Sequence, residues 1–387
     1  MMSLGEANRT VSTPEGDLIL DDSKLRWHMD RVRAWEAGER IAPISVDLAL
    51  QRACQAACRA CYAVVQEPQE RLTIGKDAID YLLEDFAGIG VRGVSIVSDG
   101  ESTLNPHYAH FIETATSYGI DVGNATNGWL FTPELAARVL PHLKWVRFTV
   151  LAGRPESYTR MMHPDPSRTD VYWNAMRNIS EAVRIKRQRK LSVTLGIQTF
   201  VTPEDGAEIK AFAQLGIDLG VQYAMIKHTS DDEVGTFGVK YGDYPKIYQA
   251  LHEAEAMSTA QTKVIVKWSK IRDADHPSYK RMYAAPFLLQ LSGSGLIAPS
   301  GMFFNQRFSK FHLGNFVEDR FIDVWRSERY WRAMNYLASP RFDAATMMGF
   351  LPIQHYANVA LDRHVKGIEK LTDPPPGTPI PLHVNFT

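Results

Sequence analysis

The sequence has few cysteines, no excess of charge and no long hydrophobic run. Lys and Arg together number 43 against 44 Asp and Glu, so the formal net charge is −1. This balance gives no field to hold a nucleic acid or to press the chain onto an acidic membrane. No stretch approaches the roughly 18 apolar residues of a membrane span, and residues 1–20 lack the pattern of a secretory signal. We therefore expect a cytoplasmic protein that binds neither nucleic acid nor membrane.

Cysteine is scarce, and the three cysteines of the chain lie within eight positions, at Cys54, Cys58 and Cys61. An odd number of cysteines closing such small loops cannot form a disulfide framework. Thiolates are soft ligands that favour iron-sulfur clusters or zinc. The pattern therefore indicates a reducing compartment and a bound metal.

The rest of the composition is typical of a folded protein, with 45% hydrophobic and 22% charged residues. From residue 41 onward, short runs rich in Val, Ile, Phe and Thr alternate with amphipathic segments of helical length, which is typical of parallel βα units. Strands are predicted over 44–50, 91–98, 121–126, 145–150, 191–200 and 221–228. Helices are predicted over 77–90, 106–119, 132–143, 171–190 and 204–216.

Six strands with helices between them predict an α/β fold, a partial (βα)6 barrel, over residues 43–240. The barrel would follow an N-terminal extension, residues 1–42, and precede a small α+β C-terminal domain, residues 241–387, with a proline-rich end. Gly90, Gly119 and Gly216 are placed as caps at helix ends. In such barrels the chemistry lies on loops after the strand C-termini.

The three cysteines directly follow the first predicted strand, so they fall on a loop of that kind. A [4Fe-4S] cluster ordinarily takes four cysteines, and this chain has no fourth. One iron would be left open to a ligand from outside the protein. The alternative is a zinc site completed by a histidine.

The spacing C-x3-C-x2-C after a first barrel strand resembles the signature of radical S-adenosylmethionine (SAM) enzymes. The resemblance implies that the open iron is chelated by SAM, which an electron from the cluster cleaves to methionine and a 5′-deoxyadenosyl radical. It also implies a small-molecule substrate and an external electron donor such as flavodoxin or ferredoxin.

Further segments resemble motifs that contact SAM in this family. Asp99-Gly100-Glu101 resembles a Gly-Gly-Glu motif, and Thr126-Asn127-Gly128 resembles a motif at the end of the third strand. The sequence departs from the family at Ala60, Asp99 and Ser102. The resemblance implies SAM contacts from Asp99, Gly100, Glu101, Asn127, Thr149, Arg160, Gln198 and Ile226, with Met225 as an alternative to Ile226.

The C-terminal part resembles the SPASM or twitch extension of many radical SAM enzymes. Ser300 stands where that pattern has a cysteine, and residues 347–364 contain none. An auxiliary cluster therefore cannot be built, which favours a redox-neutral reaction, an elimination, or reduction by an outside donor.

Some polar residues have weaker signals. Lys227 and His228 lie at the end of the sixth predicted strand and are candidate substrate contacts, together with Asp231 and Asp232. A basic run over 184–190 is read as a solvated helix end. His355 and His364 are read as packing or surface residues, and Tyr283 and Tyr356 as conceivable hydrogen donors.

We expect an enzyme that abstracts hydrogen from a small polar biosynthetic substrate, such as a sugar, nucleotide sugar or aminocyclitol. One alternative is the modification of a ribosomal peptide or protein. Another is a non-catalytic binding protein stabilised by zinc or by a cluster.

Overall fold

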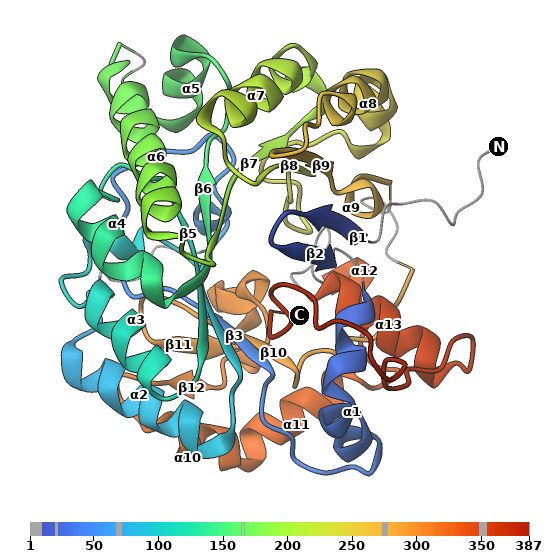
Figure 1. The fold of residues 1–387 in the computed structure, drawn as a ribbon. Helices are drawn as coiled ribbons and strands as arrows, with labels where there is room; N and C mark the ends of the chain where they lie inside the picture. The colour runs from blue at the N-terminus through green and yellow to red at the C-terminus, as the bar shows by residue number, and fades with distance from the viewer. Residues whose placement is uncertain are drawn as a thin grey trace.

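The structure is a computed structural model that describes residues 10–19, 22–66, 72–163, 165, 167–272, 278–347 and 354–386. Its centre is a curved sheet in which eight neighbouring strands run parallel in the described part of the chain (Figure 1). In sheet order these strands are β10 (Leu288–Leu291), β3 (Ser45–Leu48), β4 (Gly93–Ile96), β5 (Asp121–Thr126), β6 (Leu143–Thr149), β7 (Thr194–Val201), β8 (Tyr223–His228) and β9 (Lys263–Val266).

All six strands expected from the sequence are present as β3 to β8, and they pair in chain order. The mixed α/β fold with a parallel core is therefore confirmed. Residues beyond 240 add β9 to one edge of the sheet and β10 to the other. β10 continues into an antiparallel hairpin with β11 (Leu296–Ala298), which pairs with β12 (Gly314–Asn315). The division of the chain at residues 42 and 240 stays a prediction.

Helices cover the outer face of the sheet because each carries one apolar side. In α2, for example, Ile79, Leu82, Leu83 and Phe86 repeat every three or four residues and are buried. The helices on this face are α2 (Lys76–Ile89), α3 (Tyr108–Ser117), α4 (Pro133–Val139), α5 (Pro155–Met162), α6 (Asp170–Arg189), α7 (Gly206–Leu219), α8 (Tyr248–Ala256) and α10 (Phe321–Arg326) (Figure 1).

Two of the three expected glycine caps are confirmed and one is corrected. Gly90 and Gly119 follow α2 and α3 with positive φ values of 84° and 75°. Gly216 lies inside α7, which continues to Leu219 and is capped by Gly220. Packing explains the glycine at this position, because a Cβ on residue 216 would lie only 2.8 Å from the Cβ of Ala224.

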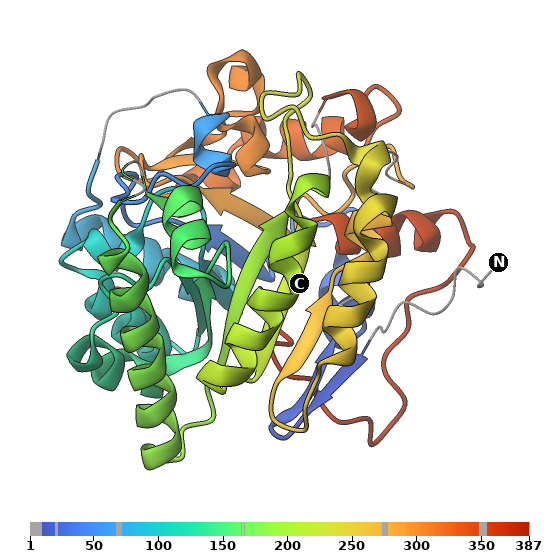
Figure 2. The same ribbon diagram turned by 90° about the horizontal axis from the view of Figure 1, so that it is seen from above.

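The concave side of the sheet is covered by segments from both ends of the chain. They are the hairpin of β1 (Thr10–Thr13) and β2 (Gly16–Ile19), α1 (Met29–Glu36), α9 (Trp268–Arg272), α12 (Ala344–Met347) and α13 (His355–Val365) (Figures 1 and 2). α11 (Glu328–Leu337) packs beside α10 instead (Figure 1). Trp35 of α1 packs against Tyr283 and Phe287, as expected of an N-terminal extension packed on a larger body.

The last described residues occupy the amino ends of the barrel strands. Phe386 packs edge-on against Trp145 of β6, with ring centroids 5.5 Å apart, and Asn385 donates to Asp121 of β5. Leu382 bridges to Leu18 of the N-terminal hairpin. This opening of the barrel is therefore filled by protein. No helix in the described ranges is both long and apolar enough to cross a membrane.

Candidate active site at the cysteine loop

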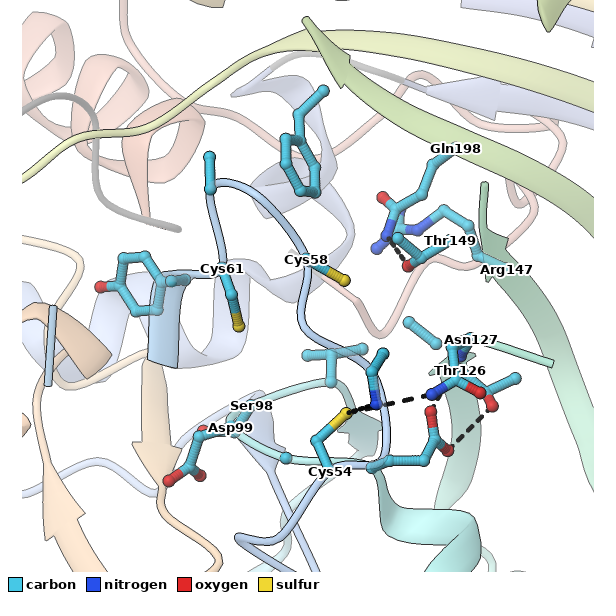
Figure 3. A pocket seen from close by; sticks show the side chains of 18 of the residues that line it. Cys54, Cys58, Cys61, Ser98, Asp99, Thr126, Asn127, Arg147, Thr149 and Gln198 are labelled. Carbon is cyan, nitrogen blue, oxygen red and sulfur yellow. Dashed lines mark hydrogen bonds between the residues drawn. The ribbon is translucent and has the colours of Figure 1, made fainter. Parts of the chain in front are cut away.

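A cavity of about 320 Å³ lies at the carboxyl ends of the parallel strands (Figure 3). Parallel strands bring their carboxyl ends to one edge, so residues distant in sequence meet there. The side chains that line it include Cys54, Cys58, Cys61, Asp99, Glu101, Asn127, Thr149, Gln198, Lys227 and His228, together with Asp47, Ser98, Arg147 and Lys270.

The three cysteines lie on the loop after β3. The loop is held from outside by Ala57 N and Arg59 N, which donate to the carbonyls of Met162 and Met161 at 2.9 Å each. Figure 3 shows the three sulfur atoms facing one space. In the described residues, no three His, Cys, Asp or Glu side chains are grouped as ligands of one metal ion. A cubane cluster needs no such grouping, because each thiolate binds a different iron.

The surroundings of the thiols disfavour free thiolates. Burial is the largest cause that raises the pKa of Cys54 to about 12, and burial also raises the pKa values of Cys58 and Cys61. At neutral pH these groups are therefore protonated until a cation compensates the charge. A set of three soft thiols lining one cavity fits an iron-sulfur cluster, whose irons supply that compensation.

Asp99 and Gly100 connect the end of β4 to the cysteine loop. The Asp99 carboxylate accepts from Arg52 Nη1 at 2.6 Å, Ser292 Oγ at 2.7 Å and Gly293 N at 2.8 Å. Gly100 has a φ of 75°, and a Cβ there would lie 2.1 Å from the Gln51 carbonyl oxygen. The Asp99 side chain therefore connects the cysteine loop to the β10–β11 hairpin. Gly100 allows the backbone after β4 to approach the backbone of Gln51 closely.

Glu101 is buried, and its carboxylate already accepts several hydrogen bonds from the protein. Its carboxylate accepts from Thr103 Oγ1 at 2.7 Å, Thr126 Oγ1 at 2.8 Å and Asn127 N at 2.8 Å. Burial raises the pKa of Glu101, although these hydrogen bonds oppose the shift. The carboxylate thus fixes the turn after β5 beside the cysteine loop.

The polar residues on β5 to β7 face the cavity and retain unused hydrogen-bonding capacity. Asn127 Nδ2 lies 3.9 Å from Cys54 Sγ, and Gln198 Nε2 donates to Thr149 Oγ1 at 3.0 Å. Gln198 Oε1 and Ser98 Oγ are buried without a hydrogen-bond partner in the described structure. Buried polar atoms left open in a cavity wall are typical of a ligand site.

Two of the predicted SAM contacts lie outside the cavity. Arg160 is exposed on α5 and donates to Ser157 Oγ at 3.2 Å. Ile226 belongs to the core between the sheet and the helices, because its neighbours Met225 and Lys227 point to the concave side. Strand alternation therefore turns the Ile226 side chain away from the site.

Three charged residues of the cavity wall were not predicted: Asp47 on β3, Arg147 on β6 and Lys270 on α9. Asp47 and Arg147 carry a signal in the sequence, since each is a charged residue inside an otherwise apolar strand. Arg147 alternates with Val146 and Phe148 and shares a face with Thr149. Lys270 follows β9 and carries no comparable signal.

Of the weaker candidates, Lys227 and His228 line the cavity, whereas the aspartates and the later histidines contact other parts of the protein. Asp231 Oδ1 accepts from the backbone nitrogen of Phe237 at 2.9 Å, and Asp232 forms ion pairs and hydrogen bonds with Arg307 and Thr236. His364 is buried and pairs with Glu36 at 2.8 Å, and His355 packs against Tyr279, as expected of packing residues. The segment 348–353, where a SPASM pattern has cysteines, lies outside the described residues.

The remaining candidates lie away from the cysteine loop. Tyr283 Oη accepts from Arg281 at 2.8 Å, and Tyr356 packs under Lys267. In the basic run, Lys186 pairs with Glu15 at 2.7 Å and Arg184 pairs with Glu181 on the helix surface. These contacts assign no ligand to the run.

Comparisons with known proteins connect this site to a fold class. No protein-family model matches the chain, and no curated protein matches it. Solved structures do match. Streptococcus suis SuiB bound to S-adenosylmethionine has a TM-score of 0.59 at 14% identity, covering 81% of this chain and 72% of SuiB. Native anSMEcpe with bound AdoMet has a TM-score of 0.56 at 14% identity, covering 76% and 84%.

This likeness establishes the fold. The chain shares its architecture with SuiB and anSMEcpe, each solved with S-adenosylmethionine bound. The domain-level resemblance to a SPASM extension stays a prediction.

Proposed function

We propose that this protein is a radical SAM enzyme whose three cysteines hold a [4Fe-4S] cluster. The observation that carries the proposal is the cysteine loop itself: it follows the first strand of the six predicted, faces a polar cavity, and belongs to a chain without a fourth cysteine. When bound, such a cluster supplies the electron that cleaves SAM and yields a 5′-deoxyadenosyl radical.

The residues of the chain would position SAM rather than take part in bond breaking. Glu101 holds the turn that carries Asn127, and Gln198 and Thr149 form a hydrogen-bonded pair on the opposite wall. The open acceptor Gln198 Oε1 suits an N–H or O–H group of the nucleoside. We assign SAM contacts to Gly100, Glu101, Asn127, Thr149 and Gln198, and omit Arg160 and the Ile226 side chain, which lie elsewhere.

The substrate is proposed to be a small polar molecule of a biosynthetic pathway. The proposal is supported by the size of the cavity and by the polar side chains deep in its wall. Because the three cysteines are all used by the cluster, electrons would come from an external donor such as flavodoxin or ferredoxin. Modification of a peptide is the second candidate, because the similar fold of SuiB is also known bound to the precursor peptide SuiA.

The test is anaerobic reconstitution with iron and sulfide, followed by measurement of iron per chain and of 5′-deoxyadenosine formed from SAM with dithionite. We expect about four irons per chain and reductive cleavage of SAM, both lost in Cys58→Ala. Ala57→Ser, an exposed change in the same loop, should retain both. One zinc per chain and no cleavage would instead identify a zinc-stabilised binding protein.

A further inference from the structure

Three cationic side chains meet in the deep wall of the cavity, and we name them the cation site: Arg147, Lys227 and Lys270. They come from three different elements, β6, β8 and α9, and all line the same cavity as the cysteines. Asp47, which accepts from Ser95, faces them from β3. Ordinary cationic side chains lie in water, so their convergence inside a barrel requires an explanation.

Arg147 lines the cavity and packs over Trp145. Its Cζ lies 5.0 Å from the centre of the Trp145 ring, and its buried Nε has no hydrogen-bond partner in the described ranges. The residue paired with it on β7 is Gly196, where a Cβ would collide with the Tyr223 ring at 2.1 Å. The Tyr223 ring therefore covers Gly196, and β7 itself contributes no polar side chain that could pair with Arg147 at this position.

The two lysines are in an environment that disfavours their charge. Burial is the main cause that lowers the pKa of Lys227 to about 7 and that of Lys270 to about 8, and Arg147 lowers both further. Among the described residues, neither ammonium group forms a hydrogen bond or an ion pair with a carboxylate. Buried like charges of this kind are stabilised chiefly by an anion.

The protein does not supply enough negative charge at this position. Asp47 supplies only one carboxylate to the cation site, and burial raises its pKa to about 6. The other carboxylates of the cavity wall are engaged elsewhere: Asp99 with Arg52, and Glu101 with the turn that carries Asn127. An excess of positive charge therefore remains at the cation site.

SAM does not balance this excess. It carries one carboxylate together with an ammonium and a sulfonium group, so its own net charge is positive. An anion that pairs with three cationic groups needs several acceptor oxygens on a compact centre, as phosphate or carboxylate groups have.

We propose that Arg147, Lys227 and Lys270 bind an anionic group, a phosphate or a carboxylate, of the substrate. The inference rests on the proposed radical SAM function and narrows its substrate to acidic small molecules. A neutral sugar or aminocyclitol would leave the three cations without a counter-charge, whereas a phosphorylated or carboxylated substrate would satisfy them.

The experiment measures anion binding on the reconstituted protein with SAM present, by calorimetric titration with inorganic phosphate and separately with acetate. The variants are Arg147→Gln and Lys227→Met, with Arg147→Lys as the charge-conserving change. The matched controls are Arg177→Gln, exposed on α6, and Lys144→Met, exposed on β6. Iron content and deoxyadenosine formation are measured on every variant.

We expect saturable binding of at least one probe in the wild type and in both controls. Loss of a charge-assisted contact should weaken it at least about tenfold in Arg147→Gln and in Lys227→Met, and less in Arg147→Lys. The difference in affinity between phosphate and acetate shows whether the cation site prefers a phosphate or a carboxylate group.

Three outcomes would overturn the inference while SAM cleavage is intact. They are no binding of either probe, equal binding in wild type and variants, and a raised KM for SAM in Arg147→Gln with unchanged anion binding. The last would assign the cations to the SAM carboxylate. Absence of iron and of SAM cleavage from the wild type would be a failure of the proposed function instead.

Discussion

The two ends of the barrel are built on opposite principles. At the amino end, polar groups meet partners from the chain termini: Thr194 Oγ1 lies 2.7 Å from His383 Nε2, and Lys24 Nζ donates to the Phe386 carbonyl at 2.8 Å. At the carboxyl end, Arg147 Nε, Gln198 Oε1 and Ser98 Oγ are buried without a hydrogen-bond partner among the described residues, and all three residues line the cavity. The amino end is organised for stability, and the carboxyl end keeps unused polar capacity for ligands.

The comparison also shows why the terminal residues matter to a site that they do not touch. Trp145 separates the two ends: Arg147 lies over its ring, and Phe386 packs against its edge. Perturbations of one end should therefore be distinguishable from perturbations of the other, and four predictions test this separation.

The largest effect is expected from ending the chain after Pro381. This truncation removes Leu382, Asn385 and Phe386 from the amino end and should lower the free energy of unfolding by about 5 kcal/mol. Urea denaturation measures the loss, and the exposed Ile380→Ala is the control. If the truncated chain does not fold, Phe386→Ala should cost about 3 kcal/mol. Wild-type stability in both variants would contradict a sealing role for the tail.

The next effect is at the carboxyl end, where Asp99→Asn leaves Arg52 without its counter-charge. The side chains of this pair are only 0% and 8% exposed, so the loss should be about 4 kcal/mol. The reconstituted protein should also retain less iron, because Arg52 leads into the cysteine loop. Asp373→Asn breaks an exposed pair, with side chains 60% and 59% exposed, and should change stability by less than about 1 kcal/mol. Equal losses of stability in Asp99→Asn and Asp373→Asn would contradict a special role for the buried pair.

A pH dependence is expected at the amino end, where burial lowers the pKa of His28 to about 4. Arg92 Nη1 lies 2.8 Å from its Nδ1, and its Nε2 lies 3.0 Å from the Val384 carbonyl, which suits the neutral ring. Because the unfolded chain takes up the proton near pH 6.5, stability contributed by His28 falls as pH decreases from about 6.5 to about 4.

Between pH 7 and 4.5 the wild type should lose about 2 to 3 kcal/mol more than His28→Gln in urea denaturation. His252→Gln, with a side chain 61% exposed, should follow the wild type. Parallel pH profiles for wild type and His28→Gln would show that the ring is not held neutral by the fold.

The smallest effect is expected at the boundary between the two ends. In Gly123→Ala a Cβ would lie 2.0 Å from the Trp145 indole, so the ring must shift at a cost of about 1 to 3 kcal/mol. The shift should also weaken anion binding at the cation site, through Arg147. Gly242→Ala meets no atom within 4 Å and should be neutral. Unchanged stability in Gly123→Ala would mean that the ring is not confined.

Much of the fold was predictable because it is written in short-range patterns. Alternation of apolar runs and amphipathic segments placed β3 to β8 and, except for α5, the α-helices between them. The motif after β3 placed the cysteines in the cavity wall. Arg160 and Ile226 show what short-range sequence patterns do not determine. Both lie near the right strand ends, but side-chain direction depends on how each helix and strand is rotated in the finished fold.

The sequence by itself determined the cysteine loop, its position after the first predicted strand and the lack of a fourth thiol, because these depend on neighbouring residues. Only the tertiary structure decided that β10 pairs with β3, that the tail fills the amino end, and that Arg147, Lys227 and Lys270 share one cavity. Such contacts join residues about 40 to 260 positions apart along the chain. No local pattern specifies them, because their stability comes from burial and charge in the assembled barrel.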